Sequence, residues 1–320
     1  MRYDLADQRL IDGWQRGFPL VARPYAEIGA ALGLGEDEVL QRLRALKDSG
    51  ALSRIGAIVR PNTAGASTLA ALAAPEGEIE RIADLVVAEP GVNHAYEREH
   101  RLNLWFVATA ADRAGVDAML ARIAARTRLP ILDLPMLRDF HIDLGFSIFD
   151  KAGAQAPRGA PPVAGPVSVD DKKLLAAMEG GLALAREPYA DIARRLQTTQ
   201  DDVRARLAAL IEAGIVRRLG LVVRHRPFGF DANAMVVWNI ADAAVEKTAA
   251  QFVAHDFVTL CYQRPRREGW PYNLFTMVHG RVREETLAQV ARLAEHAGAP
   301  HEILFSRRCF RQCGARLSAA

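Results

Sequence analysis

Apolar residues recur at helical spacing through the first fifty positions of the chain. Leu5, Leu10 and Ile11 predict a helix over residues 5–17. A second helix is expected over about 25–32, and a third from the acidic run at 36–38 to the glycine at position 50. Residues 51–60 then alternate between polar and apolar, which predicts a small wing hairpin. Three short helices and a wing are typical of a winged helix-turn-helix domain.

The period of the pattern changes after residue 62. The next stretch predicts a strand, a helix, two strands, a helix and a final strand, over 68–74, 78–88, 92–97, 103–108, 111–126 and 131–142. That order, βαββαβ, is the ferredoxin-like unit. The first half of the chain is therefore expected to hold two domains, at 1–62 and 63–150.

The whole pattern returns at a constant offset of 164 residues, which is the step from Pro24 to Pro188. Gly56 matches Gly220 at the same offset, and a gap-free repeat of a whole domain indicates an internal duplication. The predicted fold class is α+β, with two tandem copies of a winged helix-turn-helix followed by a ferredoxin-like domain. The second copy is expected at 170–227 and 228–320, and the Ala-, Gly- and Pro-rich residues 151–169 are predicted to form an extended linker.

Composition and charge narrow the class only slightly. The 320 residues are enough for several domains, and a net charge of +3 with a pI near 8.9 is weak evidence for an anionic partner. Three cysteines, an odd number in a long chain, favour a reducing compartment without a disulfide framework. The N-terminus lacks the apolar core of a signal peptide, and no apolar run is long enough to span a bilayer. We therefore expect a cytoplasmic protein.

One unusual motif occurs once in each half. Residues 92–106 place two His, two Arg, a Tyr and a Trp on two adjoining predicted strands. Residues 258–275 repeat the plan: an apolar lead-in, Tyr-x-Arg, a polar turn, and Asn-Leu followed by an aromatic residue. The chemistry of the chain is expected to centre on these two motifs.

DNA binding, the usual task of a helix-turn-helix, is disfavoured. The second helix of each helix-turn-helix opens with acids, Glu36-Asp37-Glu38 in one copy and Asp201-Asp202 in the other. Acids at a helix start suit the helix dipole but repel phosphates at the end that should read bases. The arginines of these helices are explained more simply as solvated faces with i,i+4 pairing.

Longer motifs resemble a known family. The first half holds Phe18-Pro19-Leu20-Val21, Asn93-His94-Ala95-Tyr96-Glu97-Arg98-Glu99-His100 and Phe140-His141-Ile142-Asp143. The second half holds Cys261-Tyr262-Gln263-Arg264-Pro265-Arg266 and Trp270-Pro271-Tyr272-Asn273-Leu274-Phe275. In this order they resemble the NirD and NirL halves of the fused siroheme decarboxylases, which share the plan of the Lrp/AsnC regulators. The resemblance covers nearly the whole chain.

This resemblance implies a carboxy-lyase of heme d1 biosynthesis. Such an enzyme removes CO2 from the acetate side chains at C12 and C18 of siroheme and gives 12,18-didecarboxysiroheme. No cofactor is then required, and the expected ligands are siroheme and its mono- and didecarboxylated products. The two halves are expected to pair as a pseudo-dimer, and sheet edges predict a homo-oligomer. Siroheme decarboxylase subunits of the NirG and NirH type are further candidate partners, whereas DNA and membranes are not.

The candidate site follows from the motifs and the resemblance together. Siroheme carries eight carboxylates, so its pocket needs several guanidinium groups. Histidines are the natural proton donors or iron ligands, and although one histidine on a strand is more often structural, three in two motif strands favour a function. The predicted catalytic residues are His94, His100, Tyr96 and Arg98. The predicted substrate-binding residues are Arg101, Trp105, His141, Tyr262, Arg264, Arg266, Tyr272 and Arg311. No metal site is predicted beyond a siroheme iron ligand at His94 or His141.

Loss of CO2 from a pyrrole acetate needs an electron sink, and the macrocycle serves if a ring carbon is protonated first. We therefore hypothesise acid/base catalysis by His94 and His100, with Arg98 and Tyr96 holding or polarising the carboxylates. In the second half, Leu260 stands at the position of His94, and an arginine replaces His141. The first half is therefore expected to carry the productive chemistry.

Two other functions stay open on the sequence. A regulator of the Lrp/AsnC class that senses a tetrapyrrole would share this architecture, and a non-catalytic tetrapyrrole carrier would need similar arginines and histidines. The acidic helix starts and the His-rich motif argue against the regulator. No residue argues against the carrier, because function lives in the site and not in the fold.

Overall fold

The computed structural model describes residues 3–142, 145, 147–149 and 167–314, and this part of the chain forms two compact units. The unit that we call the helical unit contains residues 3–64 and 167–228, together with residues 145 and 147–149. The other, the sheet unit, contains residues 65–142 and 229–314. Each unit therefore draws one segment from either half of the duplicated chain. The predicted linker, except for its last three residues, lies outside the described residues.

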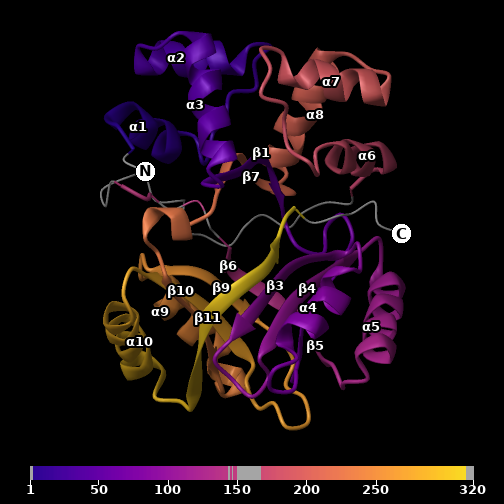
Figure 1. Ribbon diagram of the computed structural model, residues 1–320, viewed down its shortest axis with the longest axis vertical. Helices are drawn as coiled ribbons and strands as arrows, with labels where there is room; N and C mark the ends of the chain where they lie inside the picture. Colours follow the sequence, from indigo (N-terminus) through magenta and orange to yellow (C-terminus); the bar gives the residue numbers. More distant parts are fainter. Residues whose placement is uncertain (1–2, 143–144, 146, 150–166, 315–320) are drawn as a thin grey trace. The chain divides into compact units, whose positions relative to one another are not determined.

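The helical unit repeats one set of elements twice (Figure 1). Its helices start at side-chain caps where the sequence offers them: Asp4 forms a capping box with Asp7, and Ser168 and Thr199 cap two helices of the second half. In the first half the elements are α1 (Leu5–Gly13), α2 (Pro24–Leu32), α3 (Glu36–Asp48) and β1 (Leu52–Val59). In the second half they are α6 (Val169–Ala177), α7 (Pro188–Leu196), α8 (Gln200–Glu212), β7 (Val216–Val223) and the short η1 (Arg226–Phe228).

The predicted wing hairpin is wrong. Residues 52–59 form one uninterrupted strand, β1, and its antiparallel partner is β7 of the other half, with Gly56 opposite Gly220. A hairpin needs a turn inside the alternating stretch, but Gly56 stays extended within the strand and the turn comes only after Val59. The two wings therefore build a single ribbon that joins the two helix-turn-helix segments. The word ribbon is used below for β1 and β7 together.

The sheet unit contains both ferredoxin-like segments, and the predicted βαββαβ order is confirmed in each. The first comprises β2 (Ala66–Leu72), α4 (Ile79–Val87), β3 (Val92–Arg98), β4 (Leu104–Ala110), α5 (Arg113–Thr127), β5 (Leu132–Pro135) and β6 (Arg138–Ile142). The second comprises β8 (Ala232–Trp238), η2 (Asp242–Ala244), α9 (Val245–Val253), β9 (Val258–Gln263), β10 (Leu274–Gly280), α10 (Arg283–Ala297) and β11 (His301–Gln312). Within the described residues the strand order is β5-β2-β4-β3-β11-β8-β10-β9-β6.

The last strand of each half is shared between the halves. Residues 301–305 of β11 pair with β8 of their own half, whereas residues 306–312 pair with β3 of the other. In the first half the predicted strand over 131–142 is divided in two: β5 pairs with its own β2, and β6 crosses to β9. The division follows Pro135, which has no N–H to continue the ladder. The pairing of the two halves expected of a pseudo-dimer is thus present at two places, which we call the first seam (β3 with β11) and the second seam (β9 with β6).

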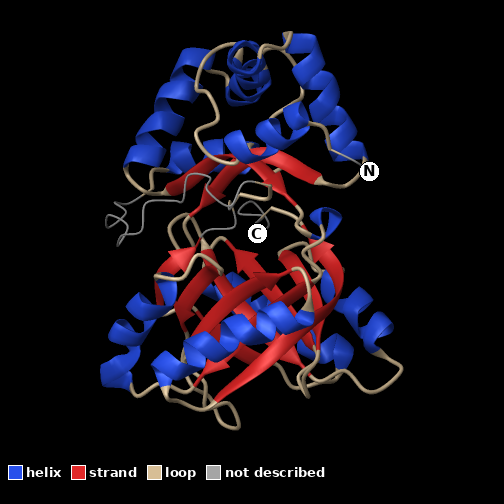
Figure 2. Cartoon of the chain, turned by 90° about the vertical axis from the view of Figure 1, so that its left-hand side faces the viewer, coloured by secondary structure: helices blue, strands red, loops and turns tan. Residues whose placement is uncertain are grey.

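The described residues of the sheet unit form three large apolar cores and one small cluster. The strands and helices that build them are drawn in Figure 2. One core lies under α4 and α5 and another under α9 and α10, each built by its own half. The central core takes residues from both halves, including Trp105, Trp270, Phe275 and Leu304. Alternation along a strand decides which core a side chain enters. Because Ala95 of β3 packs in the helix-covered core, its neighbours on either side point toward the central one.

Candidate functional site

Strand β3 carries three of the predicted catalytic residues on one face. His94, Tyr96 and Arg98 are spaced two apart, so they share the face of β3 opposite Ala95. The His94 and Tyr96 rings are stacked, with centroids 6.3 Å apart and planes 10° from parallel. Both residues are half-buried at the first seam, where His94 lies opposite Gln312 of β11. The structure therefore groups an imidazole and a phenol at the first seam, near the C-terminal end of β11.

Arg98 lies further inside and is only 7% exposed. Its Nη1 donates to the Leu304 carbonyl oxygen at 3.1 Å and to Ser306 Oγ at 2.9 Å, and its guanidinium carbon is 5.7 Å from the centre of the Tyr96 ring. Burial lowers the pKa of Arg98, because removing a cation from water disfavours its charged form. Both acceptors belong to the other half, so this side chain bridges the first seam.

Arg264 occupies the equivalent place at the second seam. It is 6% exposed, donates to the Leu134 carbonyl oxygen, and lies 4.6 Å from the centre of the Tyr262 ring. Burial lowers its pKa as well. Tyr262 itself is buried in the central core. The repeated Tyr-x-Arg motif thus builds two matched bridges between the halves, and this enclosure favours a structural role for both arginines.

His100 is not brought to His94. It lies in the turn after β3, six residues along, which corresponds to roughly 15–20 Å for nearly extended chain. Its Nδ1 accepts from the Leu102 N–H at 3.0 Å, and its Nε2 is 2.7 Å from Glu302 Oε2. Tyr272 donates its hydroxyl to the same carboxylate at 2.7 Å, and burial together with that bond raises the pKa of Tyr272 to about 12. His100 therefore joins a polar cluster that ties the first half to the second at the other end of β3.

The remaining predicted substrate-binding residues are engaged elsewhere in the sheet unit. Arg101 donates to the Gly269 carbonyl oxygen, and Arg266 pairs with Asp242 at 2.5 Å. Arg311 donates to the Val87 carbonyl oxygen at the C-terminal end of α4, a favourable place for a cation. Trp105 is 1% exposed and belongs to the central core. Contacts of these residues with a substrate stay predictions.

His141 lies at the second seam, opposite Cys261. Each seam has a register shift at the corresponding place, between Cys309 and Arg311 in the first and between Asp139 and His141 in the second. Arg311, which lies opposite Ala95, is therefore the structural equivalent of His141. His94 and His141 therefore belong to different seams. Leu260, the equivalent of His94, lies at the second seam opposite Ile142.

Two residues that meet the candidates escaped the sequence analysis. Glu302 and Ser306 of β11 contact His100 and Arg98, which lie about two hundred positions earlier in the chain. Those contacts arise only because β11 crosses to the other half. The available signal was weak: polar residues on either side of the apolar run Ile303-Leu304-Phe305.

The arginines of α3 and α8 are also engaged. Arg42 pairs with Asp4, Asp7 and Glu38, which raise its pKa, and Arg44 donates to the Leu184 carbonyl oxygen. Arg206 of α8 pairs with Asp171. These contacts agree with the solvated-face interpretation, and the absence of DNA binding stays a prediction.

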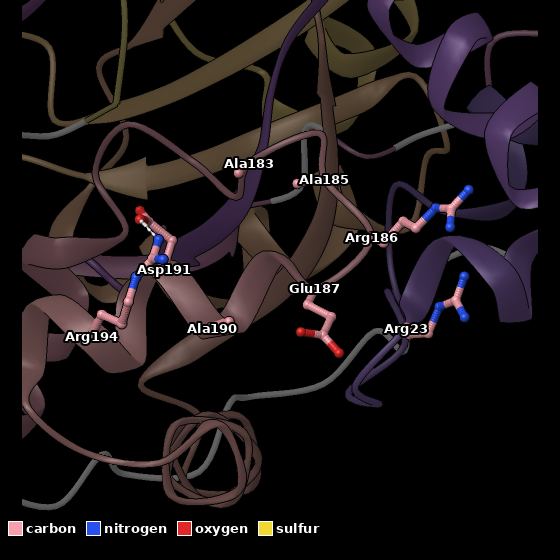
Figure 3. Close-up of a pocket in the computed structure, with 8 residues that line it drawn as sticks. All are labelled: Arg23, Ala183, Ala185, Arg186, Glu187, Ala190, Asp191 and Arg194. Atoms are coloured by element: carbon pink, nitrogen blue, oxygen red, sulfur yellow. Dashed lines mark hydrogen bonds and ion pairs between the residues drawn. The ribbon is translucent and has the colours of Figure 1, made fainter.

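An open hollow lies in the helical unit beside the start of α7 (Figure 3). Its lining alternates cations with acids, and Arg194 is paired with Asp191 at 2.8 Å. Arg23 and Arg186 bind the acids that open α3. None of the predicted site residues lines it, and its three arginines are paired with acids, so we place no reaction there.

The described residues hold neither a candidate metal cluster nor a candidate membrane span. No group of three or more His, Cys, Asp and Glu side chains there is arranged to hold a metal ion. No helix in that part of the chain is long and apolar enough to cross a membrane.

Comparison with known families follows the same division of the chain. Residues 64–141 and 227–311 match the AsnC-like ligand binding domain, and residues 7–52 and 171–217 match the siroheme decarboxylase NirDL-like HTH domain. The fold and the seams thus define a duplicated protein of the AsnC-like class, with its ligand-binding segments in one sheet unit.

Individual relatives show which family within the AsnC-like class the chain resembles. The chain is 47% identical to the siroheme decarboxylase NirDL subunit of Paracoccus denitrificans, over 99% of both chains. It is 53% identical to the NirD subunit of Stutzerimonas stutzeri, over 48% of this chain and the whole of that subunit. The crystal structure of a siroheme decarboxylase NirDL in complex with an iron-uroporphyrin III analogue is 26% identical, covers 98% of this chain and 93% of its own, and superimposes with a TM-score of 0.69. The chain belongs to the siroheme decarboxylase NirDL family.

Proposed function

We propose that this chain is a siroheme decarboxylase that removes CO2 from the acetate side chains at C12 and C18 of siroheme. The observation that carries the proposal is the match to the Paracoccus denitrificans subunit over 99% of both chains. A match of that extent includes both halves and both seams. The complex of a solved relative with an iron-uroporphyrin III analogue supports a polycarboxylate tetrapyrrole as the ligand.

His94 is the proposed proton donor. Its imidazole is half-buried beside Tyr96 at the first seam, and this partial exposure suits a group that must reach a bound macrocycle. The bond between the carboxylate carbon and the methylene carbon breaks, and its electron pair enters the protonated macrocycle. CO2 departs, a second proton adds to the former methylene carbon to make a methyl group, and the ring carbon gives up the proton it had accepted, so the net uptake is one proton. Tyr96, on the same face of β3, is proposed to hydrogen-bond the departing carboxylate.

Arg98 is assigned to positioning. Its guanidinium lies under the Tyr96 ring while it donates to two acceptors of β11, so it fixes the tyrosine relative to the seam. His100 is assigned to the polar cluster with Glu302 and Tyr272 and not to the reaction, since it lies at the far end of β3. This revises the paired role of His94 and His100 that the motif suggested.

The second seam is proposed to be unproductive. Leu260 replaces the histidine there, although Tyr262 and Arg264 repeat the rest of the motif. Both acetates would then react at the first seam, with the monodecarboxylated product turned and bound again. An iron ligand at His94 or His141 stays a prediction, and the two residues belong to different seams.

An anaerobic incubation of the purified chain with siroheme tests the proposal. Mass analysis of the extracted pigment is expected to show the loss of two CO2, with the monodecarboxylated product passing through a maximum. Unchanged siroheme with a shifted absorbance would contradict the proposal and favour a carrier. Addition of subunits of the NirH and NirG type, and sizing of the chain in solution, would show whether the proposed partners and homo-oligomer are needed for turnover.

A further inference from the structure

The first seam contains a β-bulge, in which two residues of one strand lie opposite one residue of the other. Cys309 lies opposite Tyr96 and Arg311 lies opposite Ala95, so Phe310 is the extra residue of β11. The Phe310 side chain packs against the core under α4 and α5. The bulge therefore shifts every residue of β11 beyond it by one position relative to β3.

This shift decides which side chain faces His94. Regular pairing would have placed Arg311 opposite His94, and the bulge places Gln312 there instead. Residues directly opposite each other on antiparallel strands point to the same face, with Cβ atoms about 5 Å apart. The register is held beyond the pair as well, because the Cys313 N–H donates to the Asn93 carbonyl oxygen at 2.9 Å. Gln312 is thus fixed beside the proposed proton donor.

The Gln312 carboxamide is available to a ligand. Gln312 and His94 are both half-buried. Within the part of the chain that the structure describes, the carboxamide makes no hydrogen bond to another side chain or to the backbone. It carries two N–H donors and one carbonyl acceptor, so it can bind a polar group of a molecule that lies against this face.

The second seam repeats the bulge without the polar pair. Its extra residue is Phe140, which packs against the core under α9 and α10. The residues equivalent to His94 and Gln312 are Leu260 and Ile142, which lie opposite each other. The same backbone irregularity therefore forms around an apolar pair, so the bulge does not require a glutamine. Glutamine accompanies the histidine at the seam to which the chemistry is assigned.

We propose that Gln312 is a substrate-binding residue of the first seam. Its amide N–H donates to a carboxylate that neighbours the reacting acetate on the rim of siroheme, and this hydrogen bond holds that acetate toward His94. The inference rests on the proposed function for its ligand and deepens the site at His94. Both residues belong to the sheet unit, and their placement follows from strand pairing alone.

A neutral amide suits this position better than the cation that regular pairing would bring. An arginine opposite His94 would oppose protonation of the imidazole. It would also bind the reacting carboxylate most tightly before CO2 leaves, which stabilises the ground state and not the transition state. The bulge turns Arg311 to the opposite face, where it donates to the Val87 carbonyl oxygen.

The test compares three variants of the full chain. Gln312→Met keeps the length of the side chain and removes its donors, and Gln312→Glu keeps its shape and makes it an anion. Ile142→Met changes the equivalent position of the second seam and is the matched control. Fluorescence titration gives the Kd for uroporphyrin III, an iron-free tetrapyrrole with carboxylates around its rim. Anaerobic turnover of siroheme gives KM and kcat, and thermal melting verifies the fold of each variant.

Gln312→Met is expected to raise the Kd for uroporphyrin III and the KM for siroheme about tenfold, because a hydrogen bond to a charged acceptor is lost. Gln312→Glu should raise both further, since two carboxylates then repel each other, while kcat stays within a few-fold. Ile142→Met should leave all three values unchanged. A merely structural glutamine would change the melting temperature and kcat without this order of affinities.

Wild-type affinity in Gln312→Met, equal affinities of Gln312→Met and Gln312→Glu, or the same loss in Ile142→Met would each overturn the inference. Failure of wild type to bind uroporphyrin III would overturn it as well. Siroheme turnover by wild type is scored separately. A chain that decarboxylates siroheme while Gln312 proves irrelevant refutes only this contact, and weakened uroporphyrin III binding in a chain without turnover refutes only the proposed function.

Discussion

At the scale of single residues, the Tyr-x-Arg motif marks both seams in the sequence and bridges the two halves in the structure. Tyr-x-Arg was visible in the sequence as a repeated polar signal inside apolar strands, and it marked the residues at both seams. Its arginines are nevertheless enclosed and bonded to the other half. A sequence cannot reveal that enclosure, because the acceptors lie on the crossing strands. The two copies of the motif differ chemically at one position, where the first seam has His94 and the second has Leu260.

Arg98→Met and Arg264→Met form a matched pair for separating structure from chemistry. Each removes the donor to a carbonyl oxygen of the other half, so each should lower the free energy of unfolding by about 1–3 kcal/mol. Only Arg98→Met should also lower kcat, by tenfold or more, because only the first seam holds His94 and the tyrosine that Arg98 positions. Chemical denaturation and siroheme turnover measure the two effects. Equal losses of kcat in both variants would contradict the assignment of chemistry to the first seam.

The three cysteines should differ sharply in reactivity. Cys261 is fully buried in a helix-covered core, and burial raises the pKa of its thiol, so little thiolate is present near pH 8. Cys309 is exposed and Cys313 is half-buried. Iodoacetamide labelling followed by mass mapping should therefore modify Cys309 fastest and Cys261 only after unfolding. Rapid labelling of Cys261 in the folded chain would show that the second seam opens readily.

At the scale of elements, periodicity predicted most helices and strands but not their partners. The alternation over 51–60 correctly indicated extended chain, but the predicted hairpin was wrong. The pairing partner of this strand is β7 of the other half, and local alternation carries no information about a distant partner. The predicted strand over 131–142 was likewise one run in the sequence and two strands in the fold. In both cases the missing information was a pairing with the other half of the duplication.

The ribbon tolerates no side chain at its centre. A Cβ on Gly220 would lie 2.3 Å from the Gln15 carbonyl oxygen, a backbone atom that cannot move aside cheaply. Gly220→Ala should therefore lower the free energy of unfolding by about 1–3 kcal/mol, as overpacking does. Gly180→Ala is the control, because nothing lies within 4 Å of its added Cβ. If urea denaturation gave the two variants the same stability, the close packing at the centre of the ribbon would be refuted.

At the scale of the whole molecule, the two duplicated halves pair their strands with each other. β11 reaches β3, β6 reaches β9, and β1 pairs with β7, so neither half completes its own sheets. The constant offset in the sequence indicated the duplication. Two copies that each fold independently would, however, give the same offset. Only the strand pairing shows that the halves are interdependent.

Division of the chain within residues 151–166 tests that interdependence. The two halves should yield folded protein when produced together and co-purify as a one-to-one pair, since the seams do not require the covalent connection. Each half alone should aggregate or self-associate, because it exposes unpaired strand edges. The NirD subunit of Stutzerimonas stutzeri, which matches 48% of this chain, shows that a half can exist as a separate polypeptide. Two stable, monomeric halves would contradict the prediction.

The most direct test of the account is single-turnover decarboxylation by His94→Gln, with His100→Gln as the matched histidine control. His94→Gln is expected to bind siroheme but to release CO2 at least about a hundredfold more slowly, because the proton donor is gone. His100→Gln should be less stable yet retain turnover within a few-fold of wild type, since His100 lies in the polar cluster at the other end of β3. Full activity of His94→Gln, or a selective loss of chemistry in His100→Gln, would contradict the first-seam site.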